Sequence, residues 1–192
     1  DQEKTKEYLN ISQHELSRLS LLVDKVLKLS LFENDVPRIN KAEVDFEAVL
    51  QKVLNAMSIQ VEQAGGFFKL DKQGEDFLIA ADAVHLSNVL FNLLDNSLKY
   101  TEEKPIIHLK LVAQATQVIL TISDNGIGIS TEYQSKVFDR FFRVPQQGNQ
   151  HNVKGYGLGL SYVADIIRQH NGNIILNSTE GKGTSFSIEL PR

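Results

Sequence analysis

The segment AADAVHLSNVLFNLLDNSLKY, residues 80–100, carries two different stripes on one predicted helix. Its leucines recur at helical spacing, so we predict a helix from about Asp82 to Lys99 with an apolar face. That face is formed by Leu86, Leu90, Leu93 and Leu94. Asn92, Asn96 and Lys99 follow one another at spacings of four and three, which places them on a neighbouring stripe. On an arbitrary helix such a stripe would simply face solvent, but amide oxygens can also bind Mg²⁺ and a lysine can neutralise a phosphate.

Patterns typical of short strands and of two further helices surround this segment. The further helices are predicted over about 46–63, before the turn signal Gly65-Gly66, and over about 157–170. The strand patterns are FFKLD, DFLIA, IIHLKLV, QVILTIS, NIILNS and TSFSIEL, and the two that are joined by AQAT should pair antiparallel. Helices on one face of such a sheet give an α/β two-layer sandwich. We therefore predict a mixed, mostly antiparallel sheet with three helices on one face.

The N-terminal part of the chain has a different pattern. Residues 3–32 contain no Pro or Gly, and some of their apolar side chains follow a heptad. The heptad positions are Leu9, Leu16, Leu19, Val23 and Val26. This pattern predicts one long α-helix that packs in a bundle. The polar segment ENDVPRINKAE around Pro37 is typical of a linker, so we predict one unit over residues 1–35 and a second over residues 40–192.

Composition excludes several classes of function. The chain has a net charge of −4 without a cluster of Lys or Arg, which argues against a nucleic-acid partner. It has no Cys, which excludes disulfides and thiolate metal sites. No apolar run is long enough to cross a membrane, so we expect a soluble, cytoplasmic chain without direct membrane contact. Because it begins with Asp1 rather than Met, we also expect a fragment, which leaves open a longer parent in the inner membrane.

Three glycine clusters follow the helix of residues 82–99: DNGIGI at 124–129, GYGLGLS at 155–161 and GKGTSF at 181–186. Each cluster alone is typical of a turn. GYGLGLS differs because it opens a predicted helix, where backbone N–H groups and the helix dipole can bind an anion. The dinucleotide fingerprint and the Walker motif are both absent.

In chain order, NLLDNSLKY, DNGIGI, FDRFFR, GYGLGLS and GKGTSF resemble the N, G1, F, G2 and G3 boxes of sensor histidine kinases. These kinases share a superfamily with gyrase, the heat-shock chaperones and MutL. The resemblance implies a Bergerat-type ATP fold for residues 40–192. For residues 1–35 it implies the second helix of the dimerisation and histidine-phosphotransfer hairpin. The implied enzyme is a protein-histidine kinase of a two-component system, which uses ATP and Mg²⁺ and passes the γ-phosphoryl group to a histidine outside this chain, then to a response regulator.

The resemblance also assigns roles to residues. Asp124 would accept a hydrogen bond from the exocyclic amine of adenine, and Asn96 together with Asn92 would bind Mg²⁺. The implied catalytic residues are Asn92, Asn96, Lys99 and Arg143. The implied nucleotide-binding residues are Asn92, Asn96, Lys99, Tyr100, Asp124, Gly126, Gly128, Ile129, Phe142, Arg143, Lys154, Gly155, Gly157, Leu158, Gly159, Leu160 and Thr184. Phe138, Phe141 and Phe142 would anchor the start of a mobile lid over residues 144–154.

Asn92 bears on the type of reaction. Water-splitting relatives in the superfamily carry a glutamate at this place, which activates water as a general base. An amide cannot take up a proton, so we expect phosphoryl transfer rather than steady hydrolysis. Two alternatives stay open: a degenerate nucleotide-binding module without catalysis, and an ATPase of the gyrase or chaperone type.

His14 begins the segment His14-Glu15-Leu16, which starts like the acceptor box H-E-L-R-T-P-L of these kinases. The likeness ends there, since Leu19 stands where the family has a helix-kinking proline. On the heptad His14 falls at an outward position, so we predict a surface residue and no phosphoacceptor histidine in this chain. The acceptor helix is expected before residue 1, and the chain alone should not phosphorylate itself. The implied partners are a second kinase chain, in a homodimer through the hairpin helices, and the receiver domain of a response regulator.

Overall fold

The computed structural model describes residues 38–145 and 156–192. Contacts between residues divide the chain into two units, Asp1–Arg38 and Ile39–Arg192, and the fold below is that of the second unit. The predicted long helix with His14 lies outside the described residues, as do the predicted nucleotide contacts Lys154 and Gly155. Their assignments stay predictions.

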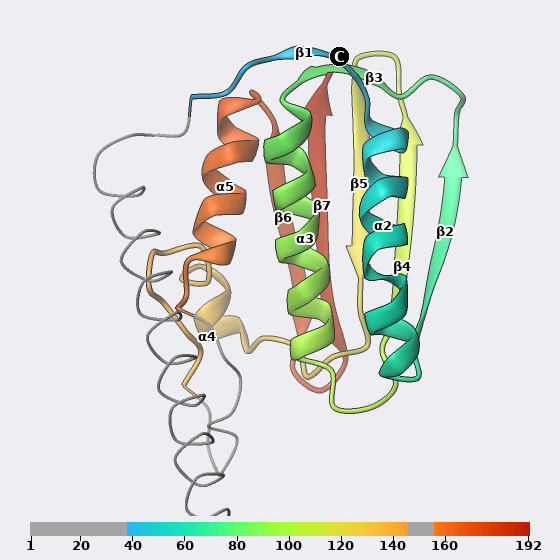
Figure 1. The fold of residues 1–192 in the computed structure, drawn as a ribbon. Coiled ribbons are helices and arrows are strands. Elements are labelled where there is room, and N and C mark those ends of the chain that lie inside the picture. Colours follow the sequence, from blue (N-terminus) through green and yellow to red (C-terminus); the bar gives the residue numbers. More distant parts are fainter. Residues whose placement is uncertain (1–37, 146–155) are drawn as a thin grey trace, which may run out of the picture. The chain divides into compact units, whose positions relative to one another are not determined.

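A five-stranded sheet forms one layer of this unit (Figure 1). In spatial order its strands are β2 (Phe67–Gln73), β4 (Ile106–Ala113), β5 (Gln117–Ser123), β7 (Gly183–Pro191) and β6 (Asn173–Thr179). β2 and β4 run parallel, whereas the other neighbouring strands run antiparallel. β4 and β5 form the predicted antiparallel pair, with His108 opposite Ser123. The prediction of a mixed, mostly antiparallel sheet is confirmed.

Three helices, α2 (Phe46–Gln63), α3 (Ala83–Lys99) and α5 (Gly159–Gln169), lie on one face of the sheet (Figure 1). The predicted two-layer sandwich is therefore confirmed. α2 begins after an aspartate cap, because Asp45 Oδ1 accepts from the N–H group of Glu47 at 3.0 Å. α5 begins at Gly159 rather than near residue 157, since Gly157 has a left-handed backbone (φ +69°) that a helix cannot include.

Two small elements are not indicated by the sequence patterns. β1 (Ala42–Asp45) pairs antiparallel with β3 (Leu78–Ala81) in a separate two-stranded sheet. β1 begins in the polar stretch assigned to the linker, and its side chains are mostly exposed, so it has no alternation of apolar and polar residues. α4 (Thr131–Gln134) is a single turn after the DNGIGI cluster.

The core lies between the sheet and the helices. Leu86, Leu90, Leu93 and Leu94 are at most 1% exposed, which confirms the predicted apolar face of α3. Alternate residues of the central strands join the same core: Ile107, Leu109, Leu111, Val118, Leu120, Ile122, Phe186, Ile188 and Leu190. The opposite face carries hydroxyl pairs, with Thr121 bonded to Ser187 and Ser123 to Ser185, each at 2.9 Å. Through this packing α3 contacts β5, the strand that ends at the DNGIGI loop.

Asp82 and His170 join the start of the unit to two of its helices. Asp82 Oδ1 caps α3 by accepting from two N–H groups of its first turn, and Oδ2 accepts from Asn40 N–H at 2.9 Å. Asp82 N–H donates to His170 Nε2 at 2.9 Å, and His170 Nδ1 donates to the carbonyl of Ile166 at 2.8 Å. Burial alone would raise the pKa of Asp82, but the backbone N–H donors hold that pKa below its usual value.

We expect the free energy of unfolding to fall as the pH is lowered below about 6.5, the usual pKa of histidine. Burial lowers the pKa of His170, because its charged form would lose water, and a protonated Nε2 could no longer accept from Asp82. The unfolded chain therefore takes up the proton at a higher pH than the folded chain. Stability that is present above pH ~6.5 is lost on acidification, by at most about 1.4 kcal/mol per pH unit from this residue.

Urea unfolding at pH values of about 7.5, 6.5 and 5.5 measures this effect. In His170→Asn the loss between the two lower pH values should shrink. An unchanged pH dependence in this variant would show that other groups cause it.

Candidate functional site

The C-terminal half of α3 carries the predicted amide stripe. Asn92 Nδ2 donates to the carbonyl of Asn88 at 2.8 Å, which leaves Asn92 Oδ1 directed at the first residue of α5. A methyl group on Gly159 would come within 2.7 Å of this oxygen, so the two helices approach closely here. Asn96 is half-buried, and its side-chain amide has no hydrogen bond among residues 38–145 and 156–192. Asn96 therefore offers an amide oxygen to a ligand.

Asp124 directly follows β5 and is held by three donors. Its Oδ1 accepts from the N–H groups of Gly126 and Thr184, both at 3.0 Å. Its Oδ2 accepts from the hydroxyl of Ser97, in the last turn of α3, at 2.9 Å. The N–H group of Asp124 also donates to the carbonyl of Thr184 at 2.8 Å. These bonds fix the carboxylate at the point where β5, β7 and α3 meet.

Gly128 and Gly183 allow segments of backbone to approach closely beside Asp124. Gly128 has φ +71°, and a methyl group there would lie 2.1 Å from the carbonyl oxygen of Thr179. Gly183 has φ +99°, and a methyl group there would lie 2.0 Å from the carbonyl oxygen of Asp124. Both glycines thus have a reason within the chain itself, which is to hold the DNGIGI loop against the hairpin of β6 and β7. A contact of Gly128 with the nucleotide stays a prediction.

Lys99 and Tyr100 lie at the end of α3. Lys99 forms an ion pair with Asp95, one helical turn earlier, and the two side chains are 40% and 47% exposed. An exposed pair of this kind contributes only about 0–1 kcal/mol, so Lys99 can exchange its partner for a phosphate at small cost. The carbonyl of Tyr100 accepts from Ile127 N–H at 2.9 Å, which attaches the end of the helix to the DNGIGI loop.

The three phenylalanines of FDRFFR lie in different environments. Phe138 packs edge-on against Phe186 of β7, with 6.3 Å between the ring centroids, and Phe142 lies 6.0 Å from Tyr133 of α4. Phe141 is instead 54% exposed and has a left-handed backbone, with φ +65°. The expectation that all three rings anchor the segment is therefore wrong for Phe141, because its side chain lies in solvent.

The start of α5 lies beside this segment. Phe141 N–H donates to the carbonyl of Gly157 at 2.9 Å. Leu158 occupies the N-cap position, and no side chain in the described part of the chain caps the helix. The first N–H groups of α5 therefore remain available to an anion. Arg143 ends the preceding segment and is exposed, so its predicted contact with phosphate stays a prediction.

The remaining predicted residues that the structure describes lie at the DNGIGI loop or at the start of α5. Ile129 N–H donates to Ser178 Oγ at 2.8 Å, which fixes the end of the DNGIGI loop on β6. Leu158 is buried, and Leu160 packs against the core. The structure thus shows where these apolar side chains lie, and their contact with a nucleotide stays a prediction.

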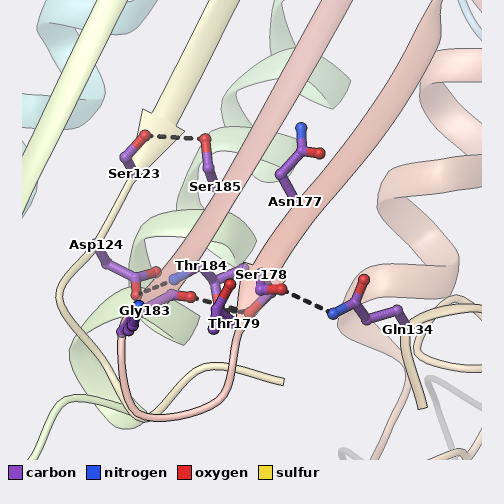
Figure 2. A pocket seen from close by; sticks show the side chains of 10 residues that line it. Ser123, Asp124, Gln134, Asn177, Ser178, Thr179, Gly183, Thr184 and Ser185 are labelled. Carbon is purple, nitrogen blue, oxygen red and sulfur yellow. Dashed lines mark hydrogen bonds between the residues drawn. The ribbon is translucent and has the colours of Figure 1, made fainter. Parts of the chain in front are cut away.

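A pocket of about 410 Å³ lies beside Asp124 (Figure 2). Its walls come from the ends of β5, β6 and β7 and from α4, and most of the lining residues have polar side chains. Figure 2 shows Asp124 and Thr184 close together near the hairpin, with Ser123 and Ser185 farther along the strands. Gln134 bounds another side, where its Nε2 donates to the carbonyl of Ser178 at 2.9 Å. The lining does not include Asn92, Asn96 or any residue of α5.

The structure brings the predicted residues together at two junctions. Asp124 meets Gly126 and Thr184 at the end of β5, and Asn92 meets Gly159 between α3 and α5. Sequence reasoning missed Ser97, which is 3% exposed and belongs to the first junction. A serine among the buried leucines of a helix needs a hydrogen-bond partner, and this requirement is the signal that could have pointed to it.

Residues 81–192 match the family described as histidine kinase-, DNA gyrase B- and HSP90-like ATPase. The chain belongs to this ATPase family. The sensor protein RprX of Bacteroides fragilis (strain YCH46) is 39% identical over 92% of the chain. The histidine kinase AdeS of Acinetobacter baumannii has a solved structure that is similar over 92% of the chain and 79% of its own, with a TM-score of 0.69 and 30% identity. The histidine kinase ThkA, solved in complex with the response regulator protein TrrA, is similar over the whole chain and 52% of its own, with a TM-score of 0.74 and 26% identity.

This histidine kinase-like ATPase spans 34% of the length of RprX. In its described part, no helix is both long and apolar enough to cross a membrane. The same residues contain no group of three or more His, Cys, Asp or Glu side chains arranged to hold a metal. An amide oxygen such as that of Asn96 is a donor that could hold Mg²⁺.

Proposed function

We propose that the chain is the ATP-binding catalytic part of a sensor histidine kinase, which transfers the γ-phosphoryl group of ATP to a histidine outside the chain. The observation that carries this proposal is the carboxylate of Asp124, whose three donors leave one acceptor position for the amine of adenine. The groups suited to phosphate, Asn96 and the start of α5, lie on the two helices that meet at the second junction. The similarity to sensor proteins such as RprX supports the same conclusion.

Adenine recognition is assigned to Asp124. A carboxylate accepts hydrogen bonds, and the 6-amino group of adenine donates them. Guanine carries an oxygen at the same place, so two acceptors would face each other. ATP is therefore the proposed nucleotide.

The phosphates are assigned to the space between α3 and the start of α5. There the first N–H groups of α5 would donate to phosphate oxygens, and Lys99 and Arg143 would add positive charge. Asn96, with Asn92 Oδ1 beside it, would hold Mg²⁺, which neutralises charge on the phosphates when bound.

Asn92 favours transfer over hydrolysis. Its amide cannot take a proton from water, and its Nδ2 is already engaged by the carbonyl of Asn88. The γ-phosphoryl group should therefore persist until a ring nitrogen of a histidine attacks it. A P–N bond then forms, the bond to the oxygen that bridges the β- and γ-phosphorus breaks, and ADP leaves.

Labelled ATP tests this function. The chain is incubated with γ-labelled ATP, Mg²⁺ and a separate helical hairpin that carries the acceptor histidine of a sensor kinase. We expect acid-labile label on the hairpin and none on the chain, and we expect Asn96→Ala to abolish the transfer.

Each other result of that assay points to a different alternative. Steady release of phosphate by the chain would favour an ATPase of the gyrase or chaperone type. Binding of ATP without transfer would favour the degenerate, non-catalytic module. Acid-labile phosphate on His14 would contradict the proposal that the acceptor lies outside this chain.

The partners follow from the same proposal. They are a second kinase chain, paired through the hairpin helices, and the receiver domain of a response regulator. The complex of ThkA with TrrA supports the second partner, because it contains a related kinase and a response regulator. We place the activity in the cytoplasm, where ATP is available to the kinase.

A further inference from the structure

Ser97 lies against Asp124 and has one proton to donate. Its hydroxyl oxygen is 2.9 Å from Asp124 Oδ2 and 3.2 Å from the carbonyl oxygen of Leu93. The carboxylate is the nearer acceptor and the charged one, and charge-assisted hydrogen bonds are the stronger. The hydroxyl proton therefore points to Asp124.

The bond from Ser97 decides which part of the carboxylate stays open. Each carboxylate oxygen can accept two hydrogen bonds. Oδ1 accepts two, from Gly126 and Thr184, while Oδ2 accepts one, from Ser97. Among the described residues, one acceptor position on Oδ2 is thus left over. Because Ser97 holds one side of Oδ2, the next donor must approach from the other side.

We propose that Ser97 is a positioning residue that makes this site select 6-amino purine nucleotides over 6-oxo purine nucleotides. The inference rests on the proposed function, since it concerns the same nucleotide site. Ser97 would not contact the purine itself. It would act through Asp124, by keeping the carboxylate in one orientation.

A 6-oxo purine in the same pose would place its oxygen, an acceptor, against the carboxylate of Asp124. The carboxyl group would then have to rotate away. Rotation would break the bonds from the N–H groups of Gly126 and Thr184, which are fixed in the backbone, and the bond from the hydroxyl of Ser97. The hydroxyl of Ser97 therefore adds to the cost of accepting the wrong purine.

Ser87 provides a matched control on the same helix. Its hydroxyl donates to the carbonyl four residues earlier, Ala83, at 2.7 Å. Ser97 lies at the same distance in sequence from Leu93 but directs its proton to Asp124 instead. Removing the hydroxyl of Ser87 thus reproduces the local change in the helix and leaves Asp124 untouched.

The experiment measures the dissociation constants of ATP and of inosine triphosphate for the 192-residue chain by calorimetry. The variants are Ser97→Ala, Ser97→Thr, Ser87→Ala and Asp124→Asn. In Ser97→Ala we expect the preference for ATP over inosine triphosphate to fall about tenfold, the effect of one hydrogen bond to a charged group. Ser97→Thr keeps the hydroxyl and should keep the preference, and Ser87→Ala should match the wild-type chain.

Two results would overturn the inference in distinguishable ways. If Ser97→Ala keeps the wild-type preference while Asp124→Asn loses ATP, then Asp124 reads the purine without help from Ser97, and the proposed function stands. If Asp124→Asn binds ATP as tightly as the wild-type chain, then the assignment of adenine to Asp124 fails, and the role of Ser97 fails with it. Thermal unfolding of each variant, compared with Ser87→Ala, shows that the chain is folded in the assay.

Discussion

Replacing Asp124 by asparagine should raise the dissociation constant of ATP at least about 100-fold without unfolding the chain. The asparagine oxygen would keep the place of Oδ1, because the N–H groups of Gly126 and Thr184 both point there. The amide nitrogen would then occupy the place of Oδ2. Its N–H groups would face the adenine amine, which is also a donor, so the bond that selects the purine would become a repulsion.

Calorimetric titration of the chain with a non-hydrolysable ATP analogue measures this loss. Asp71→Asn is the matched control, since it removes the same charge from β2, where Asp71 accepts from the ring of His108 at 2.6 Å. The control should bind within about twofold of the wild-type chain. Equal affinities for the two asparagine variants would show that Asp124 does not contact the nucleotide.

Gly128→Ala should lower the free energy of unfolding by about 3 kcal/mol or more. An alanine at φ +71° is strained in itself, and its methyl group would meet the carbonyl oxygen of Thr179 at 2.1 Å. The atoms that the methyl group would meet belong to the backbone, so no side chain can turn aside to relieve the contact. The DNGIGI loop would have to move away from the β6–β7 hairpin, and Asp124 would lose its position.

Gly181→Ala separates the two causes. Gly181 has nearly the same backbone, with φ +75°, but a methyl group there would meet nothing within 4 Å. Its replacement should cost only the backbone strain, about 1–2 kcal/mol. Urea unfolding of both variants gives the comparison. Equal losses of stability would mean that the close approach to Thr179 has no energetic weight.

The parts of the fold that the sequence predicts are those that local patterns encode. The leucines of α3 repeat at helical spacing, and they are the residues that fill the core. The order of the glycine boxes likewise indicates the ATPase family, which the match over residues 81–192 shows. β1 escapes such patterns because its side chains are mostly exposed, so that backbone pairing with β3 alone defines it.

The candidate site is less predictable, because its contacts join distant parts of the chain. Ser97 and Asp124 are separated by 27 residues, and neither residue alone indicates the other. Phe141 belongs to a cluster of three phenylalanines, yet its ring is exposed and its backbone is left-handed, which the sequence pattern does not indicate. Side-chain type was therefore a poor guide to burial at this one place.

α3 is held by a carboxylate at each end, since Asp82 caps its first turn and Asp124 accepts from Ser97 in its last. Successive residues of a helix are turned by about 100°, so a slip of one residue would carry Ser97 away from Asp124 and Asn92 away from Gly159. Leucine packing can exchange one apolar neighbour for another, but hydrogen bonds to fixed carboxylates cannot. The two aspartates therefore fix the rotational position of the helix. In a correctly folded chain the same bonds align the side chains that would meet the nucleotide.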